Sequence, residues 1–158
     1  MSSKSVDKLL KEKKISDIVN PRLIQAPSRT SLQAAVELMR KEQSAYIVVA
    51  DGKKVVGMFT ETDVIQKILN RAVDWTRPIK DFMTPDPMVL KPGDSVGQAI
   101  DLMAEHRVYH IPLVDGKNQL TGVLSVRTLI RFLAEFYPSE VYNLPPNLHQ
   151  IMQTPEGG

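Results

Sequence analysis

The sequence predicts an α+β fold in which two β-α-β-β-α repeats pack about a pseudo-twofold axis. Three observations lead to this prediction: an internal repeat at an offset of 64 residues, strand-like apolar runs that alternate with helical patterns, and turn residues between them. The 158-residue chain is 42% apolar, enough to build a core without disulfides or metals. It has no cysteine, which excludes disulfide scaffolds, thiolate zinc sites and cysteine nucleophiles.

The repeat becomes visible when the chain is compared with itself. Apart from a one-residue slip that pairs Ile24 with Val89 and Pro27 with Pro92, the offset of 64 residues holds as far as Gln119. One inserted residue there raises it to 65, so that Gly57 falls on Gly122 and Thr60 on Ser125. The pairs before the insertion include Ala35 with Ala99, Leu38 with Leu102, Met39 with Met103, Ile47 with Ile111, Asp51 with Asp115 and Gly52 with Gly116.

The repeat predicts five segments along the chain. Residues 1–14 form an N-terminal helical cap, residues 15–69 the first motif, residues 70–78 a linker, residues 79–136 the second motif and residues 137–158 a Pro-rich C-terminal tail.

The first motif contains strand patterns over residues 23–26, 46–50 and 55–59, helical patterns over 32–41 and 61–69, and a turn at Asp51-Gly52. These apolar runs are too continuous for strands with one face in water. We therefore expect each small sheet to be covered by helices on one side and by the other repeat on the opposite side.

The second motif follows the same order. Residues 87–91 predict a strand, residues 92–95 a turn with a helix-capping Ser or Asp, and the apolar spacing over 96–103 a helix. Apolar runs over 109–114 and 120–124 then flank the hairpin turn at 115–118. A closing helix carries Leu129, Ile130 and Leu133.

Charge and hydropathy narrow the class of partner. With 20 Lys and Arg against 18 Asp and Glu, the net charge of +2 does not favour nucleic acid. The run Lys8, Lys11, Lys13 and Lys14 is more typical of a solvated helix face. No apolar run approaches the roughly 18 residues of a membrane span, and the first 15 residues lack the apolar stretch of a signal peptide. We predict a cytoplasmic protein with no nucleic-acid or membrane partner.

Two stretches carry a family resemblance: Gly57-Met-Phe-Thr60-Glu-Thr-Asp63 in the first repeat, and His110-Ile-Pro112-Leu-Val-Asp115-Gly116 through Gly122-Val-Leu-Ser125 in the second. With the preceding Asp81-Phe-Met83-Thr84-Pro85, the chain resembles a tandem pair of cystathionine β-synthase (CBS) domains, a Bateman module in a stand-alone CBS domain protein. The resemblance implies a regulatory module that binds an adenosine nucleotide (AMP, ADP or ATP) and senses cellular energy or nucleotide status.

Thr60 and Asp63 suit that ligand chemically. Thr60 ends a strand and precedes a helix, so its hydroxyl and the free N–H groups of the first helical turn can hold a phosphate. The Asp63 carboxylate can accept both ribose hydroxyls. The alternative is that Thr60 only caps the helix and Asp63 is only a favourable helix-start charge.

The resemblance also implies how the second repeat completes this main cleft. Met88 and Val89 would lie against the adenine, with Val108, Tyr109 and His110 on the base and phosphate side and Arg127 reaching the phosphates. An imidazole with a pKa near 6.5 would hold phosphate more strongly at low pH. The alternatives are a hydrogen-bonded histidine and a solvated arginine. The predicted main site comprises Thr60, Asp63, Met88, Val89, Val108, Tyr109, His110 and Arg127.

A second cleft departs from the pattern. Ser125 keeps the hydroxyl, but Thr128 stands where Asp63 would repeat, so the carboxylate that reads ribose is missing. Losing a charge-assisted bond of roughly 1.5 to 3 kcal/mol implies at least tenfold weaker adenosine binding. The predicted weak site comprises Ile24, Ala45, Tyr46, Ser125 and Thr128.

An enzyme has little support. His106, His110 and His149 lack metal-ligand spacing, and Asp63, Asp81, Asp101 and Asp115 form no evident acid/base pair. We therefore predict no catalytic residue, no metal and no catalytic cofactor. The alternative function is a ligand-free structural module that dimerises or holds a partner.

The helices predict a homodimer, because they carry more apolar surface than one small core needs. A regulated protein of unknown identity would be a further partner. The residues expected on these faces are Val36, Met39, Val64, Ile68, Ile100, Met103, Ile130 and Leu133.

Overall fold

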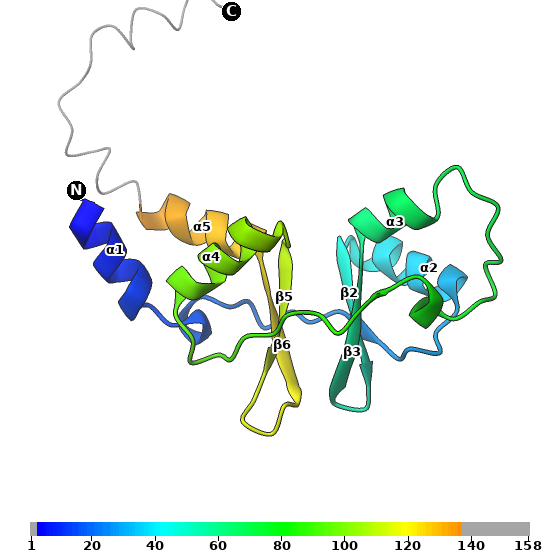
Figure 1. The fold of residues 1–158 in the computed structure, drawn as a ribbon, viewed down its shortest axis with the longest axis horizontal. Helices are drawn as coiled ribbons and strands as arrows, with labels where there is room; N and C mark the ends of the chain where they lie inside the picture. The colour runs from blue at the N-terminus through cyan, green and yellow to red at the C-terminus, as the bar shows by residue number, and fades with distance from the viewer. Residues whose placement is uncertain (1–2, 137–158) are drawn as a thin grey trace, which may run out of the picture.

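The computed structural model describes residues 3–136 and has the predicted α+β organisation, with the β-α-β-β-α order present twice (Figure 1). The predicted tail over 137–158 lies outside the described residues. In chain order the elements are α1 (Ser3–Glu12), η1 (Ile15–Asp17), β1 (Gln25–Ala26), α2 (Leu32–Glu42), β2 (Tyr46–Asp51), β3 (Lys54–Thr60), α3 (Glu61–Lys67), η2 (Ile79–Asp81), β4 (Thr84–Pro85), α4 (Val96–His106), β5 (His110–Val114), β6 (Leu120–Ser125) and α5 (Val126–Phe136).

The two hairpins, β2-β3 and β5-β6, lie side by side in the middle of the molecule, with α2 and α3 beyond one and α4 and α5 beyond the other (Figure 1). In repeat 1, β1 pairs parallel to β2, and β4 pairs antiparallel to β3. Each of the two clefts predicted from the sequence therefore lies between the end of one repeat's hairpin and residues of the other repeat.

The strand predicted over residues 87–91 is reduced to one parallel bridge, Leu90 with Leu113. Pro87 and Pro92 lack the N–H that a ladder needs, and Asp86 has a left-handed backbone with φ of 46°. The chain therefore runs past the hairpin as an extended segment with a single paired residue.

Serine caps begin the long helix of each repeat. The hydroxyl of Ser31 accepts the N–H of Ala34 at 3.1 Å, and that of Ser95 accepts the N–H of Gln98 at 3.1 Å. Of the two capping residues that the sequence allowed in repeat 2, Ser95 is thus the one used. Both helices end in a left-handed residue, Gln43 with φ of 49° and Arg107 with φ of 53°.

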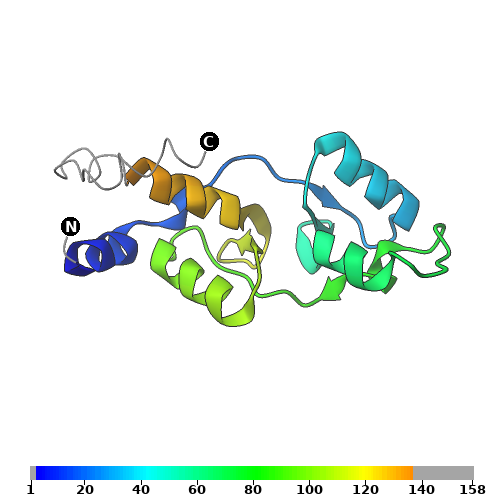
Figure 2. The same cartoon turned by 90° about the horizontal axis from the view of Figure 1, so that it is seen from above.

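The turn that opens each repeat packs on the other repeat. Ile15 is fully buried in the core of repeat 2, where its N–H donates to the carbonyl of Asp94 at 2.9 Å. Ile79 is fully buried in the core of repeat 1, where its N–H donates to the carbonyl of Thr30 at 2.6 Å. Figure 2 shows the two connecting segments running between the two lobes. The repeats are therefore interleaved, and each needs a segment of the other's sequence to complete its core.

Gly57 allows the segment after η2 to approach β3. A Cβ atom at this position would lie 2.3 Å from the sulfur of Met83 and 3.0 Å from the carbonyl oxygen of Thr84. The missing side chain therefore permits the pairing of β3 with β4, which holds Thr84 beside the start of α3.

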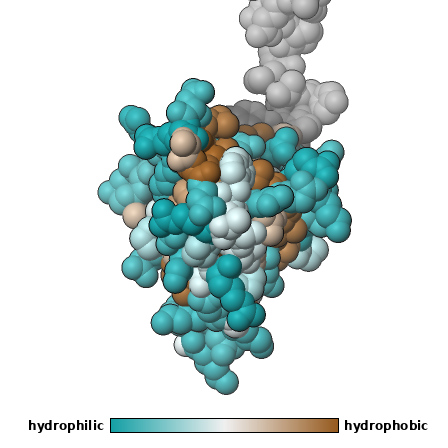
Figure 3. Space-filling view, turned by 90° about the vertical axis from the view of Figure 1, so that its right-hand side faces the viewer, coloured by the Kyte–Doolittle hydropathy of each residue, from teal (hydrophilic) through white to brown (hydrophobic). Residues whose placement is uncertain are grey.

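Of the eight residues predicted on apolar helical faces, Ile130 is exposed, four are half-buried, and the prediction of surface exposure is wrong for three. Met39, Ile68 and Met103 are only 9%, 4% and 6% exposed and belong to the cores of their own repeats, because they project from the inner helix faces toward the strands. Ile130 is 59% exposed and does lie at the surface, as does Ile65 at 64%. Apolar side chains reach the surface among polar ones at the repeat 1 end of the molecule (Figure 3).

No helix in the described part of the chain combines the length and the apolarity that a membrane span requires.

Candidate functional site

The main cleft is a hollow of about 370 Å³ between the two repeats, with Thr60 and Asp63 on one side and residues of repeat 2 on the other. Six of the eight predicted residues line it: Thr60, Asp63, Met88, Val108, Tyr109 and His110. Val89 does not, because successive residues of an extended segment face opposite sides and Met88 is the one turned to the cleft. Arg127 does not line it either.

Asp63 is a buried carboxylate with internal partners. Its Oδ2 accepts the N–H of Thr60 at 3.0 Å, and its Oδ1 accepts the hydroxyl of Thr84 at 3.0 Å and pairs with the ammonium of Lys67 at 2.8 Å. Only 4% of the residue is exposed. Oδ2 also accepts the Thr60 hydroxyl at 3.4 Å, so four donors occupy the roughly four acceptor positions of the carboxylate. A ribose that binds here has to replace at least one of these partners.

Lys67 and Thr84 also line the main cleft and were not predicted from the sequence. The Lys67 ammonium also donates to the carbonyl oxygens of Phe82 at 2.7 Å and Met83 at 3.3 Å, so it ties α3 to the segment leading into β4. The spacing of four residues between Asp63 and Lys67 is a signal that could have identified this ion pair. Thr84 comes beside Asp63 only through the β3-β4 pairing, which the sequence does not reveal.

The mouth of the main cleft carries another residue that was not predicted, Arg107. It ends α4 in a left-handed conformation, and Gln43 is its counterpart in repeat 1. The exposed Arg107 side chain is thereby available at the cleft to an anionic group of a ligand.

His110 lies between the two clefts and lines both of them. Its ring packs in a tilted arrangement against that of Tyr46, the equivalent residue of repeat 1, with ring centroids 4.8 Å apart and an interplanar angle of 34°. Burial lowers the pKa of His110 to about 4. The imidazole is therefore neutral at pH 7 in the free protein, where it can offer a hydrogen bond but no positive charge.

The second cleft is a hollow of about 510 Å³ that brings together Ala45, Tyr46, Ser125 and Thr128 of the predicted weak site. Ile24 is absent from its lining, because its side chain is 8% exposed and lies in the core of repeat 1. Arg127, predicted for the main cleft, lines this one instead. Ser125 caps α5, since its hydroxyl oxygen accepts the N–H of Thr128 at 3.2 Å.

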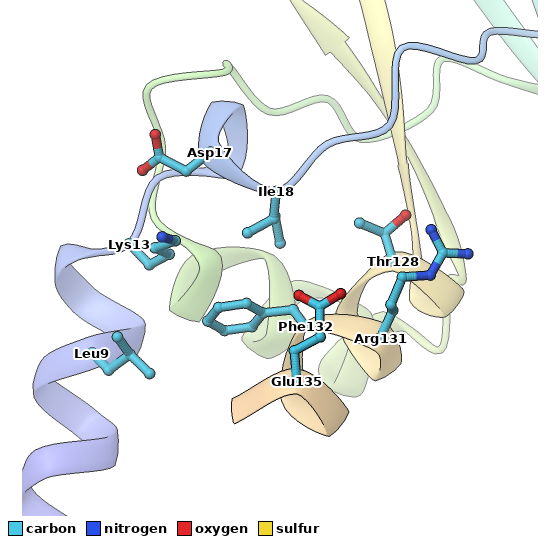
Figure 4. Close-up of a pocket in the computed structure, with 8 residues that line it drawn as sticks. All are labelled: Leu9, Lys13, Asp17, Ile18, Thr128, Arg131, Phe132 and Glu135. Atoms are coloured by element: carbon cyan, nitrogen blue, oxygen red, sulfur yellow. The ribbon is translucent and has the colours of Figure 1, made fainter. Parts of the chain in front are cut away.

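A further hollow, of about 410 Å³, lies between α1, η1 and α5 (Figure 4). Leu9, Ile18 and Phe132 give it an apolar floor. Two cations, Lys13 and Arg131, and two acids, Asp17 and Glu135, surround that floor. The balanced charges favour no particular ligand, and Thr128 and Arg131 line both this hollow and the second cleft.

Among residues 3–136, no group of three or more His, Asp or Glu side chains could hold a metal ion.

Comparison with known proteins places the fold in a family. The family model of the CBS domain matches residues 15–70 and 79–135, more than half of the chain. The chain belongs to the CBS domain family and is built as a CBS domain pair. It is 28% identical over 125 residues to an uncharacterized 17.7 kDa protein of Acidianus ambivalens, and this match covers 78% of this chain and 75% of that protein. Two longer relatives match over a small part of their length: 35% of an uncharacterized 33.4 kDa protein of Thermofilum pendens and 23% of the inosine-5'-monophosphate dehydrogenase of Methanocaldococcus jannaschii.

Two solved structures have the same fold. The CBS domain protein PAE2072 of Pyrobaculum aerophilum, complexed with AMP, superposes with a TM-score of 0.68 at 22% identity, over 73% of this chain and 89% of that one. The CBS domain pair of protein MJ0100, in complex with 5'-methylthioadenosine and S-adenosyl-L-methionine, superposes with a TM-score of 0.69 at 20% identity. This match covers 77% of this chain and 99% of that one.

Proposed function

We propose that this chain is a regulatory module, without catalytic activity, that binds an adenosine nucleotide in the main cleft and reports cellular energy or nucleotide status. The observation that carries the proposal is the convergence of six predicted residues from both repeats on one hollow. Two solved CBS pairs with this fold hold adenosine compounds, AMP in one and 5'-methylthioadenosine with S-adenosyl-L-methionine in the other. AMP, ADP or ATP would then be the regulatory ligand, and the cytoplasm the site of action.

The lining of the main cleft supports each part of such a ligand. Met58, Met88 and Val108 provide apolar surface for the adenine. Thr60 and Asp63 provide the hydroxyl and carboxylate for ribose and phosphate. Because both repeats contribute, a bound nucleotide would bridge them, and this contact would connect occupancy to the relative position of the repeats.

A thermal-shift screen with AMP, ADP, ATP, S-adenosylmethionine and NAD tests the proposal. A ligand at about a hundred times its Kd adds roughly 2.7 kcal/mol of stability. We expect at least one adenosine nucleotide to raise the melting temperature, and NAD to have less effect. No shift with any adenosine compound at millimolar concentration would contradict the proposal.

A second candidate function is a ligand-free module that dimerises or holds a protein partner. It is favoured by the internal partners of Asp63, because Lys67, Thr84 and Thr60 satisfy the carboxylate without a ligand. The same screen separates the two functions, since only the ligand-binding module is stabilised by nucleotide.

We also propose that the chain forms a homodimer through its closing helices. Ile65 of α3 and Ile130 of α5 occupy equivalent positions in the two repeats and are 64% and 59% exposed. A groove beside Ile65 is lined by Val36 and Met39 of α2 and by Val64 of α3. Two exposed apolar side chains on matching helices favour a closed, twofold contact.

A further inference from the structure

We propose that the second cleft is an anion site that recognises a chain of phosphate groups rather than a nucleoside. Its lining contains three arginines, Arg22, Arg127 and Arg131, and no Asp or Glu. The main cleft, by contrast, is lined by three carboxylates and two cations, with His110 neutral. The two clefts are related by the repeat but have opposite electrostatic character.

The internal repeat shows how this difference arises. At equivalent positions, acids of the main cleft are replaced by neutral or basic residues, and neutral residues are replaced by arginines. Reading from the main cleft to the second, Glu61 corresponds to Val126, Asp63 to Thr128, Asp86 to Arg22, Thr62 to Arg127 and Gln66 to Arg131. Five replacements in the same direction convert a site that can read ribose into one that attracts anions.

The arginines are available to a ligand. All three are exposed, and no acid among residues 3–136 lies within 4 Å of the Arg127 or Arg131 guanidinium to form an ion pair. Arg22 is held by Glu42, since its Nη2 donates to the Glu42 carbonyl oxygen and lies 3.9 Å from the Glu42 Oε2, so it would meet a ligand with its other donors. Figure 4 shows Arg131 and Thr128 next to one another on α5, with their polar ends pointing the same way.

The lining favours an oligophosphate. A guanidinium offers a planar pair of donors that matches a phosphate group, and three of them match three or more negative charges. The hydroxyls of Ser125 and Thr128, 3.2 Å apart, add donors at the start of α5. Two sources share this chemistry: inorganic tripolyphosphate and the phosphate chain of a nucleoside triphosphate. The inference uses other residues than the proposed function of the main cleft and does not rest on it.

Calorimetric titration of the whole chain with inorganic tripolyphosphate tests this assignment. We expect binding at about one site per chain, and Arg127→Gln and Arg131→Gln should each weaken it by about tenfold or more. Arg71→Gln, which removes the same charge from the exposed loop after α3, is the matched control and should leave affinity unchanged. Raising the ionic strength from about 0.1 M to 1 M should weaken binding strongly, because the Debye length falls from about 10 Å to 3 Å.

Competition then identifies the source of the phosphates. ATP that displaces tripolyphosphate supports a nucleotide ligand, and ATP that fails to displace it supports the free polyanion. The assignment is overturned if tripolyphosphate does not bind, if adenosine displaces it, or if the two cleft variants bind it as tightly as Arg71→Gln does. Because the two clefts are titrated with different probes, AMP for the main cleft and tripolyphosphate for the second, failure of one proposal does not decide the other.

Discussion

Asp63 and Thr128 occupy equivalent positions in the two clefts, and this pair of residues distinguishes them most sharply. Asp63→Ala should weaken AMP binding by about tenfold or more, because a charged acceptor for the ribose is lost. Thr128→Ala should change it little. Calorimetry with both variants checks this, with circular dichroism to confirm that Asp63→Ala still folds without the Lys67 ion pair. Equal effects of the two substitutions would show that the clefts have been assigned the wrong way round.

His110 should make stability depend on pH. Burial holds its pKa at about 4 in the folded chain, below the value near 6.5 of an unfolded histidine. The unfolded state therefore binds the proton more readily, and the stabilisation is complete above pH 6.5 and is lost as pH falls toward 4. Urea unfolding of the wild type and of His110→Gln at several pH values measures this. The wild type should lose more stability than the variant over that window, and parallel curves would refute the assignment.

At the scale of elements, the contact of β3 with β4 determines where Thr84 meets Asp63. Gly57→Ala should destabilise the fold by about 1 to 3 kcal/mol, because the new methyl group would press on Met83 and on the Thr84 carbonyl. Gly116→Ala is the control, since a Cβ there meets nothing within 4 Å. Chemical denaturation should show a lower midpoint for the first variant only. An unchanged midpoint for Gly57→Ala would mean that the segment can move away without loss.

The secondary-structure elements could largely be predicted from the sequence, because turns, caps and apolar spacing are local signals. The strand predicted over residues 87–91 forms only one bridge, because the flanking prolines lack the N–H groups that strand pairing needs. The interleaving of Ile15 and Ile79 was not predicted. Self-comparison identifies these two residues as equivalent, but it does not say on which copy each one packs.

The candidate site was partly predictable for a related reason. Six residues converge as the motif indicated, whereas Val89 and Arg127 do not. Which of two neighbouring residues faces a cleft depends on the twist and position of the segment. Which cleft an arginine reaches depends on how the two repeats pack. Residue spacing alone determines neither the twist of the segment nor the packing of the two repeats.

For the whole molecule, the exposed closing helices lead to a prediction about assembly. Light scattering at micromolar concentration should give about twice the 17.7 kDa mass of one chain. Ile65→Lys or Ile130→Lys should shift it toward a monomer, because a charge in an apolar contact is costly. Trp75→Lys, at an exposed linker position, is the control. A monomer mass for the wild type, with and without nucleotide, would exclude the dimer.

The central claim is that the CBS pair binds an adenosine nucleotide in the cleft that contains Asp63, and that the two clefts are unequal. Calorimetric titration of the purified chain with AMP tests both parts in one experiment, because it measures stoichiometry and affinity together. We predict about one strong site per chain. Two equally tight AMP sites, or no binding of AMP, ADP, ATP or any other adenosine compound, would contradict the account.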